Sequence, residues 1–233
     1  MISPASAFKL VNRGFDKAVC LIPGWATDIR IFSALELNYN YLLPVKLNFH
    51  DFEEALLDFI NKNSLEKISL LGWSQGAFPA ACFASKNPGR VEELILISTQ
   101  ERFDPFTLKD IERKIKINKR AFLYKFYLDF FCPGDKQGPA WFRRHLLKSY
   151  LKEAEIEDLV SGLDYLSTAR IDPDALLGLS KILMLHGRED KICPFEQGLR
   201  LKEKIGRAEF IALPGCGHLP FFNQEFRKNL LHG

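Results

Sequence analysis

No stretch of the sequence approaches the roughly 20 consecutive apolar residues that a membrane-spanning helix requires. Residues 1–6 lack a basic segment followed by an apolar one, so we expect no signal peptide and no membrane partner. Cysteine is also scarce: the chain has only five, an odd number with no Cys-x-x-Cys spacing. This pattern favours reduced thiols in a cytoplasmic protein over disulfides or a zinc site, and we expect neither a metal nor a cofactor.

Neither sign of charge dominates the whole chain, which carries a net charge of +3 over 233 residues. This length, with a hydrophobic content of 47%, suffices for one large core, so we expect one α/β domain with an insertion. Positive charge is nevertheless concentrated between Lys109 and Lys152, where twelve Lys or Arg residues occur with only four Asp or Glu residues. A segment of this composition would attract an acidic partner.

The most informative motif is Gly72-Trp73-Ser74-Gln75-Gly76. Strand-forming residues 67–71 precede it, and the small apolar residues 77–84 that follow are typical of a buried helix. A serine on a sharp strand-to-helix turn forms a nucleophile elbow, in which flanking glycines allow the neighbouring chain to pass closely. The turn also places Ser74 at a helix N-terminus, which favours negative charge. Because Gly-x-Ser-x-Gly also occurs by chance, its partners decide the interpretation.

Further apolar runs predict the elements around this motif. Buried strands are expected at residues 18–22, 94–97, 181–185 and 209–213. Residues 51–63 have the apolar period of an amphipathic helix. A weaker strand at residues 42–47 contains Pro44, which favours a place at the edge of the sheet. Alternating strands and helices at these spacings predict a mostly parallel sheet.

The segment Pro23-Gly24-Trp25 follows the first buried strand, at the sheet edge where α/β proteins bind ligands. We predict that the backbone N–H groups of Trp25 and Gln75 form an oxyanion hole, because such a hole needs donors beside the nucleophile. Trp73 is a further candidate for contact with substrate. In the alternative, Trp25 only caps the core and the Gln75 side chain faces solvent.

Two more candidates follow the last two predicted strands. Asp190 comes after strand 181–185 and His218 comes after strand 209–213, so both belong to the same sheet edge as Ser74. The order Ser, Asp, His is the order in α/β-hydrolases. We predict that Asp190 orients His218, which takes the proton from Ser74. Alone, an Asp in a loop is usually a turn residue and a single His is usually structural, but the three together favour catalysis.

Residues 101–165 differ from the rest because strand patterns stop and aromatic residues become frequent. We interpret this segment as a helical lid with an apolar inner face and a basic outer face, inserted into a core of residues 1–100 and 166–233. A basic, aromatic stretch can also bind nucleic acid, but no nucleic-acid-binding motif accompanies it, and we expect no such partner. A solvated helical surface without a partner is the other interpretation.

These motifs resemble those of the α/β-hydrolases over nearly the whole chain: the elbow, His186-Gly187-Arg188-Glu189-Asp190 and Gly217-His218. The chain resembles more narrowly the BioH-type pimeloyl-[acyl-carrier protein] methyl ester carboxylesterases of biotin biosynthesis. The shared features are Gly24-Trp25, the Leu-Gly-Trp-Ser elbow, residues 162–168 and His218-Leu219-Pro220-Phe221. One departure is Pro23, which stands where His usually precedes the oxyanion glycine, and it leaves the substrate open.

The resemblance implies an α/β-hydrolase fold and a serine carboxylesterase that removes the methyl ester of a pimeloyl chain on acyl carrier protein. Family members hold this acidic carrier through basic lid residues, so the candidates here are Arg113, Arg120, Arg143, Arg144 and Lys148. Other activities stay open: a small-ester esterase, a thioesterase, a C–C hydrolase or a lyase of the menaquinone-pathway type. A receptor without enzymatic activity is a further alternative, because a fold alone does not fix function.

Overall fold

The computed structural model describes residues 7–45 and 49–231. Its centre is a seven-stranded sheet in the order β1-β3-β2-β4-β5-β6-β7. All neighbouring strands are parallel except β1 and β3, which run antiparallel. The strands are β1 (Phe8–Val11), β2 (Ala18–Ile22), β3 (Asn40–Pro44), β4 (Ile68–Trp73), β5 (Val91–Ile97), β6 (Ile182–Gly187) and β7 (Glu209–Leu213). The mostly parallel α/β sheet predicted from the sequence is therefore confirmed.

The prediction of an edge position for the strand containing Pro44 is wrong. This strand, β3, lies between β1 and β2, and β1 is the edge strand instead. Proline is tolerated because the pairing of β3 with β2 ends at Leu42, so the missing N–H group of Pro44 interrupts no bond between those strands. The last part of the predicted strand, residues 46 and 47, lies outside the described residues.

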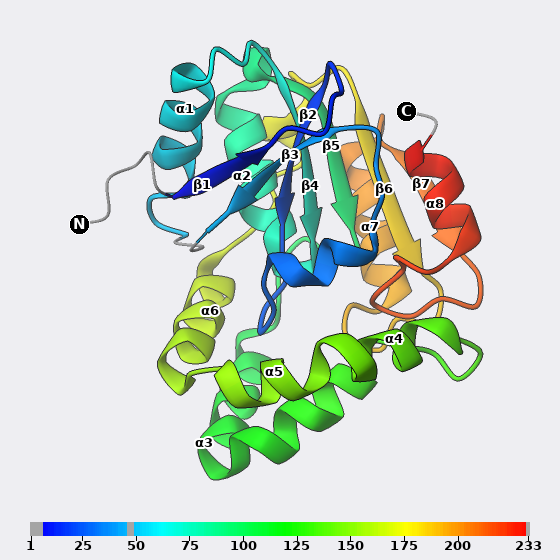
Figure 1. The fold of residues 1–233 in the computed structure, drawn as a ribbon. Coiled ribbons are helices and arrows are strands. Elements are labelled where there is room, and N and C mark those ends of the chain that lie inside the picture. The colour runs from blue at the N-terminus through cyan, green and yellow to red at the C-terminus, as the bar shows by residue number, and fades with distance from the viewer. Residues whose placement is uncertain (1–6, 46–48, 232–233) are drawn as a thin grey trace.

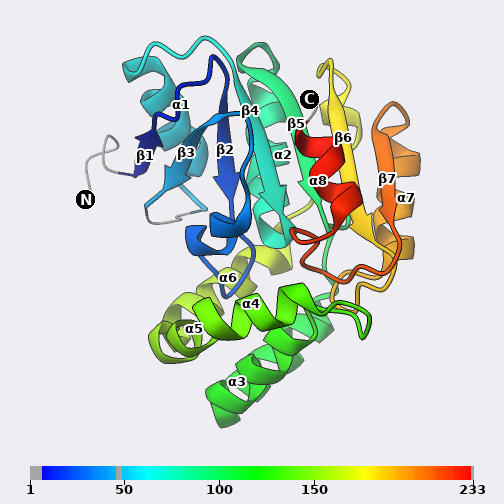
Figure 2. The same cartoon turned by 45° about the vertical axis from the view of Figure 1, so that its right-hand side comes forward.

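Helices cover both faces of the sheet (Figure 1 and Figure 2). Helices α1 (Phe52–Lys62), α2 (Ala77–Lys86) and α7 (Phe195–Ile205) pack on one face. Helix α8 (Gln224–Leu231) and the short 3-10 helix Ile29–Ala34 lie on the other. The predicted apolar period of α1 is confirmed, because its buried residues are Phe52, Ala55, Leu56, Phe59 and Ile60.

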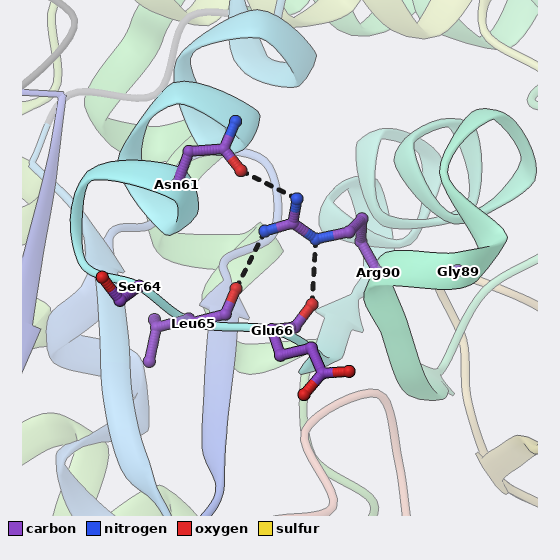
Figure 3. Close-up of a pocket in the computed structure, with 6 residues that line it drawn as sticks. All are labelled: Asn61, Ser64, Leu65, Glu66, Gly89 and Arg90. Carbon is purple, nitrogen blue, oxygen red and sulfur yellow. Dashed lines mark hydrogen bonds between the residues drawn. The ribbon is translucent and has the colours of Figure 1, made fainter.

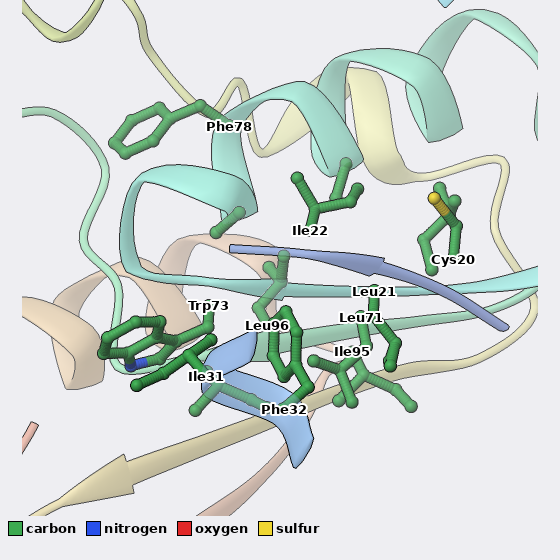
Figure 4. Close-up of a cluster of buried hydrophobic side chains, with 14 of the residues drawn as sticks. Cys20, Leu21, Ile22, Ile31, Phe32, Leu71, Trp73, Phe78, Ile95 and Leu96 are labelled. Atoms are coloured by element: carbon green, nitrogen blue, oxygen red, sulfur yellow. The ribbon is translucent and has the colours of Figure 1, made fainter. Parts of the chain in front are cut away.

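The core lies on both sides of the central strands. Every residue of β2 and β4 is buried, which explains why their sequences are mostly apolar instead of alternating, with Ser69 of β4 as the one polar residue. Figure 4 shows Ile22 and Phe78 on one side of these strands and Trp73, Ile31 and Phe32 on the other. Each fully buried Ile, Leu or Phe side chain in this core contributes about 1.5–3 kcal/mol to stability. The strand ends that carry the candidate residues are therefore held on a rigid base.

Four α-helices between β5 and β6 lie together at the carboxyl ends of the strands (Figure 1 and Figure 2). We call them the insertion helices: α3 (Pro105–Leu128), α4 (Gln137–His145), α5 (Leu147–Glu153) and α6 (Ile156–Thr168). Helix α3 starts where the Asp104 carboxylate accepts hydrogen bonds from the N–H groups of Phe106 and Thr107. It is interrupted at Asn118, whose backbone is not helical. None of the helices among the described residues combines the length and the apolar character needed to cross a membrane.

Candidate active site

Ser74 stands at the turn between β4 and α2, as the motif predicts. Its φ of 55° lies in the left-handed region, which is strained for any residue other than glycine. The flanking glycines allow the turn, because a Cβ at Gly72 would lie 2.5 Å from the Gly76 carbonyl oxygen and a Cβ at Gly76 would lie 2.2 Å from the Ile22 carbonyl oxygen. The backbone thus has the form of a nucleophile elbow.

The structure brings Asp190 and His218 together. His218 Nδ1 lies 2.8 Å from Asp190 Oδ2, and both side chains are buried. The other carboxylate oxygen accepts hydrogen bonds from the backbone N–H groups of Ile192 and Cys193 at 2.8 and 2.9 Å. Burial alone would raise the pKa of Asp190, but the neighbouring charge of His218 and hydrogen bonds from His186 and His218 lower it to about 2. Asp190 is therefore an ionised partner for the histidine.

A second histidine, His186, contacts the same carboxylate and was not assigned a role from the sequence. Its Nε2 atom lies 2.8 Å from the carbonyl oxygen of Cys193 and 3.4 Å from Asp190 Oδ2. Helix α7 approaches the other side of its ring so closely that a Cβ at Gly198 would lie 2.2 Å from His186 Nδ1. His186 therefore stabilises the loop that carries Asp190 through its contacts with Cys193 and Asp190. A single buried His in a strand gives no signal of this role in the sequence.

The elbow and the histidine loop are joined directly. The indole N–H of Trp73, the residue before Ser74, donates a 2.8 Å hydrogen bond to the carbonyl oxygen of His218. The rings of Trp73 and Phe130 lie 5.3 and 5.7 Å from the His218 ring between centroids. Trp73 therefore fixes the histidine loop from the side of Ser74. Its contact with substrate stays a prediction.

The predicted oxyanion segment lies against the elbow. A Cβ at Gly24 would lie 3.1 Å from Ser74 Cβ, so the chain reaches Trp25 immediately beside Ser74. The alternative in which the Gln75 side chain faces solvent is wrong: the residue is only 3% exposed, and its amide donates to the carbonyl oxygen of Gly162 at 2.7 Å. Trp25 is buried as well, and its indole N–H donates to the carbonyl oxygen of Leu159 at 2.9 Å.

The basic candidates lie on the insertion helices, exposed to solvent. Arg113 and Arg120 belong to α3, Arg143 and Arg144 to α4, and Lys148 to α5. Arg113 pairs with Asp110 at 2.7 Å. Within the part of the chain that the structure describes, the other four make no ion pair or side-chain hydrogen bond. Their charges are therefore available to a partner.

Two surface cavities lie away from Ser74, Asp190 and His218. One of about 440 Å³ lies near Asn61 and Arg90, at the start of β4 and β5 (Figure 3). The Arg90 side chain donates there to the carbonyl oxygens of Leu65 and Glu66 and to Asn61, so three of its five N–H donors are engaged within the protein. The other, of about 640 Å³, lies beside α6 and Lys116. Among residues 7–45 and 49–231, no group of three or more His, Cys, Asp or Glu side chains could hold a metal ion.

Comparison with known proteins agrees with this geometry. The model of the alpha/beta hydrolase fold family matches residues 23–225. The chain belongs to the α/β-hydrolase family. Its strained elbow serine and its buried Asp–His pair stand at the strand ends where this family places its reactive groups.

This α/β-hydrolase has relatives with different names. It is 26% identical over 174 residues to the pimeloyl-[acyl-carrier protein] methyl ester esterase of Nitrosomonas europaea, covering 69% of this chain and 68% of the relative. It is 25% identical over 223 residues to the 2-hydroxy-6-oxononadienedioate/2-hydroxy-6-oxononatrienedioate hydrolase of Escherichia coli, covering 90% and 72%. An esterase structure from Exiguobacterium antarcticum shares the fold, with a TM-score of 0.81 at 18% identity over 97% of this chain and 94% of the other.

Proposed function

We propose that this α/β-hydrolase is a serine carboxylesterase in which Ser74, His218 and Asp190 form the catalytic triad. The observation that carries the proposal is the 2.8 Å contact between His218 Nδ1 and Asp190 Oδ2, at the same sheet edge as the strained Ser74. Because Nδ1–H donates to the carboxylate, the Nε2 atom of His218 has a free lone pair and can accept a proton. A nucleophile, its base and an orienting acid are the parts that acyl transfer requires.

The proposed reaction has two steps. The Ser74 hydroxyl attacks the ester carbonyl while His218 takes its proton, and the backbone N–H groups of Trp25 and Gln75 stabilise the oxyanion. The tetrahedral intermediate collapses, and the alcohol leaves with the proton that His218 returns. Water then attacks the acyl-enzyme, again losing a proton to His218, and the carboxylic acid is released as Ser74 regains its hydrogen.

We infer that the preferred substrate is the methyl ester of a pimeloyl group held by acyl carrier protein, so that the leaving alcohol is methanol. Two features support this choice. One is the name of the Nitrosomonas europaea relative. The other is the exposed positive charge on the insertion helices, with Arg120, Arg143, Arg144 and Lys148 unpaired in the described structure. A cationic surface beside the site would capture an acidic carrier and speed its association.

A second candidate is hydrolysis of a small dicarboxylate by the same residues. It is favoured by the Escherichia coli relative, whose name gives a dioate as its substrate and whose similarity extends over 90% of this chain. A C–C hydrolase of this kind would use the triad without a carrier protein. The two candidates therefore differ in whether the basic surface contributes to turnover.

The test compares methanol release from pimeloyl-acyl carrier protein methyl ester with release from the same acyl methyl ester without carrier, using Ser74→Ala as the blank. Strong preference for the carrier-bound ester is the expected result. Turnover of the free ester alone would retain the serine esterase and exclude the carrier. Turnover of a dienedioate substrate with no ester hydrolysis would favour the second candidate.

A further inference from the structure

Helix α6 is bonded to both residues that we assign to the oxyanion hole. The indole N–H of Trp25 donates to the Leu159 carbonyl oxygen at 2.9 Å, and the side-chain amide of Gln75 donates to the Gly162 carbonyl oxygen at 2.7 Å. The two carbonyls come from positions three residues apart, so they belong to the same face of α6. A carbonyl oxygen has two lone pairs, so each can accept these bonds in addition to its helical one.

The sequence of α6 is adapted to this approach at one position. A Cβ at Gly162 would lie 2.7 Å from Trp25 Cδ1 and 3.3 Å from Gln75 Nε2. The first distance is a clash with a side chain that is itself buried. Glycine within a helix costs up to about 1 kcal/mol relative to alanine, so its presence here indicates that the close approach of α6 is worth more than this cost.

A third contact connects α3 to the segment that contains Trp25. The hydroxyl of Tyr127 donates a 2.7 Å hydrogen bond to the carbonyl oxygen of Ala26, whose φ of 59° is in the left-handed region. The Phe126 ring packs edge-to-face on the Trp25 ring at 5.0 Å between centroids. The insertion helices thus fix the strained turn after β2, in addition to covering the strand ends.

We propose that the Gln75 side chain is a positioning residue that couples the placement of α6 to the oxyanion hole. Its amide fixes α6 to the elbow, while Trp25 fixes α6 to the other side of the hole. The two backbone N–H donors therefore have catalytic geometry only when α6 is seated on both side chains. This inference rests on the proposed serine esterase function, because it concerns the oxyanion donors assigned there.

The coupling has a clear physical basis. Gln75 is buried, so its amide would lose its hydrogen bond if α6 moved away, and an unpaired buried amide is unfavourable. The α6 contact and the oxyanion contact share the same residue, one through the side chain and the other through the backbone. A small rotation of the elbow would therefore misalign the donor. Complete loss of one oxyanion donor typically lowers kcat by about 10²- to 10³-fold, so partial misalignment should have a smaller effect.

Two variants test the coupling from its two sides. Gln75→Leu keeps the backbone N–H and a similar volume but removes the side-chain donor, and Gly162→Ala forces α6 away from Trp25. Ser161→Ala is the matched control, because Ser161 is the exposed neighbour of Gly162 on the same helix. The readouts are kcat and KM for p-nitrophenyl butyrate, the inhibition constant of an alkyl boronic acid that mimics the tetrahedral intermediate, and amide hydrogen exchange of residues 156–168.

For Gln75→Leu and Gly162→Ala we expect kcat to fall roughly tenfold, which is less than the fall caused by complete loss of an oxyanion donor. KM should stay within about twofold of the wild-type value. Boronic acid binding should weaken by a similar factor, and α6 should exchange faster, whereas Ser161→Ala should match the wild type. The coupling would be overturned if both variants kept the wild-type kcat and boronic acid affinity. It would also be overturned if a smaller folded fraction accounted for the whole loss of activity, or if amide exchange in α6 did not change.

Failure of the proposed function would give a different result. If Ser74→Ala retained full turnover of p-nitrophenyl butyrate, the nucleophile assignment would be wrong whatever the Gln75 variant did. If the wild type hydrolysed this ester but not the carrier-bound one, only the substrate proposal would fail. The exchange readout for α6 depends on neither outcome, so the structural part of the coupling is tested in every case.

Discussion

His218 Nδ1 donates a 2.8 Å hydrogen bond to Asp190 Oδ2, and the two side chains are almost completely shielded from solvent. This pair leaves only the Nε2 atom of the ring to accept a proton. Removing the charge of the acid should therefore damage catalysis more than folding. We expect Asp190→Asn to lower kcat by on the order of 10³- to 10⁴-fold, because the amide stabilises the wrong histidine tautomer. Steady-state ester hydrolysis measures this, with the exposed Asp16→Asn as control, and a loss below tenfold would contradict the assigned role.

The depressed pKa of Asp190 also predicts how stability depends on pH. Its pKa falls from the ordinary 3.8 to about 2. Burial disfavours the ionised carboxylate, but the neighbouring His218 and His186 stabilise it by more. A carboxyl group with a lowered pKa stabilises the fold above its unfolded pKa, and this stability is lost as pH falls toward the folded value. The ionised group thus contributes about 2 kcal/mol above pH 4. Denaturant unfolding should show the gap between wild type and Asp190→Asn narrowing from pH 4 to pH 2, and a constant gap would refute the linkage.

The close approach at the elbow predicts a large cost for a single methyl group. A Cβ at Gly76 would lie 2.2 Å from the Ile22 carbonyl oxygen, and neither backbone segment can move without disturbing the sheet. We expect Gly76→Ala to reduce the free energy of unfolding by about 2–3 kcal/mol. Gly89→Ala is the control, because no atom lies within 4 Å of the added methyl group. Chemical denaturation that gave equal stability for both variants would exclude the tight turn.

How much of the candidate site could be predicted depends on how far apart along the sequence the contacting residues lie. The common location of Ser74, Asp190 and His218 could be predicted from the sequence, because each follows an apolar strand and the carboxyl ends of parallel strands meet at one edge. The contact of Gln75 with Gly162 could not be predicted. It spans 87 positions and depends on how α6 docks, which no local pattern encodes.

The fold shows the same distinction. The strands β2 and β4 can be predicted because burial on both faces makes their sequences mostly apolar. The four-residue β1 is too short to have a distinctive pattern, so its pairing outside β3 could not be predicted, and Pro44 alone favoured the sheet edge for β3. The effect of Pro44 depends on where the pairing with β2 stops, which is a tertiary property.

Charge on the insertion helices should matter only for a carrier-bound substrate. We expect the double substitution Arg143→Glu and Arg144→Glu to lower kcat/KM for pimeloyl-acyl carrier protein methyl ester on the order of tenfold at low salt. Hydrolysis of p-nitrophenyl butyrate should not change, because both residues are exposed and neither belongs to the proposed triad. The control is the double substitution Arg207→Glu and Lys228→Glu, which reverses the same charge outside the insertion helices. Equal losses with both substrates would argue against a carrier surface.

The identity of the nucleophile can be tested without knowing the natural substrate. A fluorophosphonate reacts with an activated serine to form a stable phosphonylated product, so intact-mass and peptide mass spectrometry should find one adduct, on Ser74. The adduct should be absent from Ser74→Ala and form much more slowly in Asp190→Asn. An unlabelled wild type, or an adduct that persists in Ser74→Ala, would contradict the assignment of Ser74 as the nucleophile of this α/β-hydrolase.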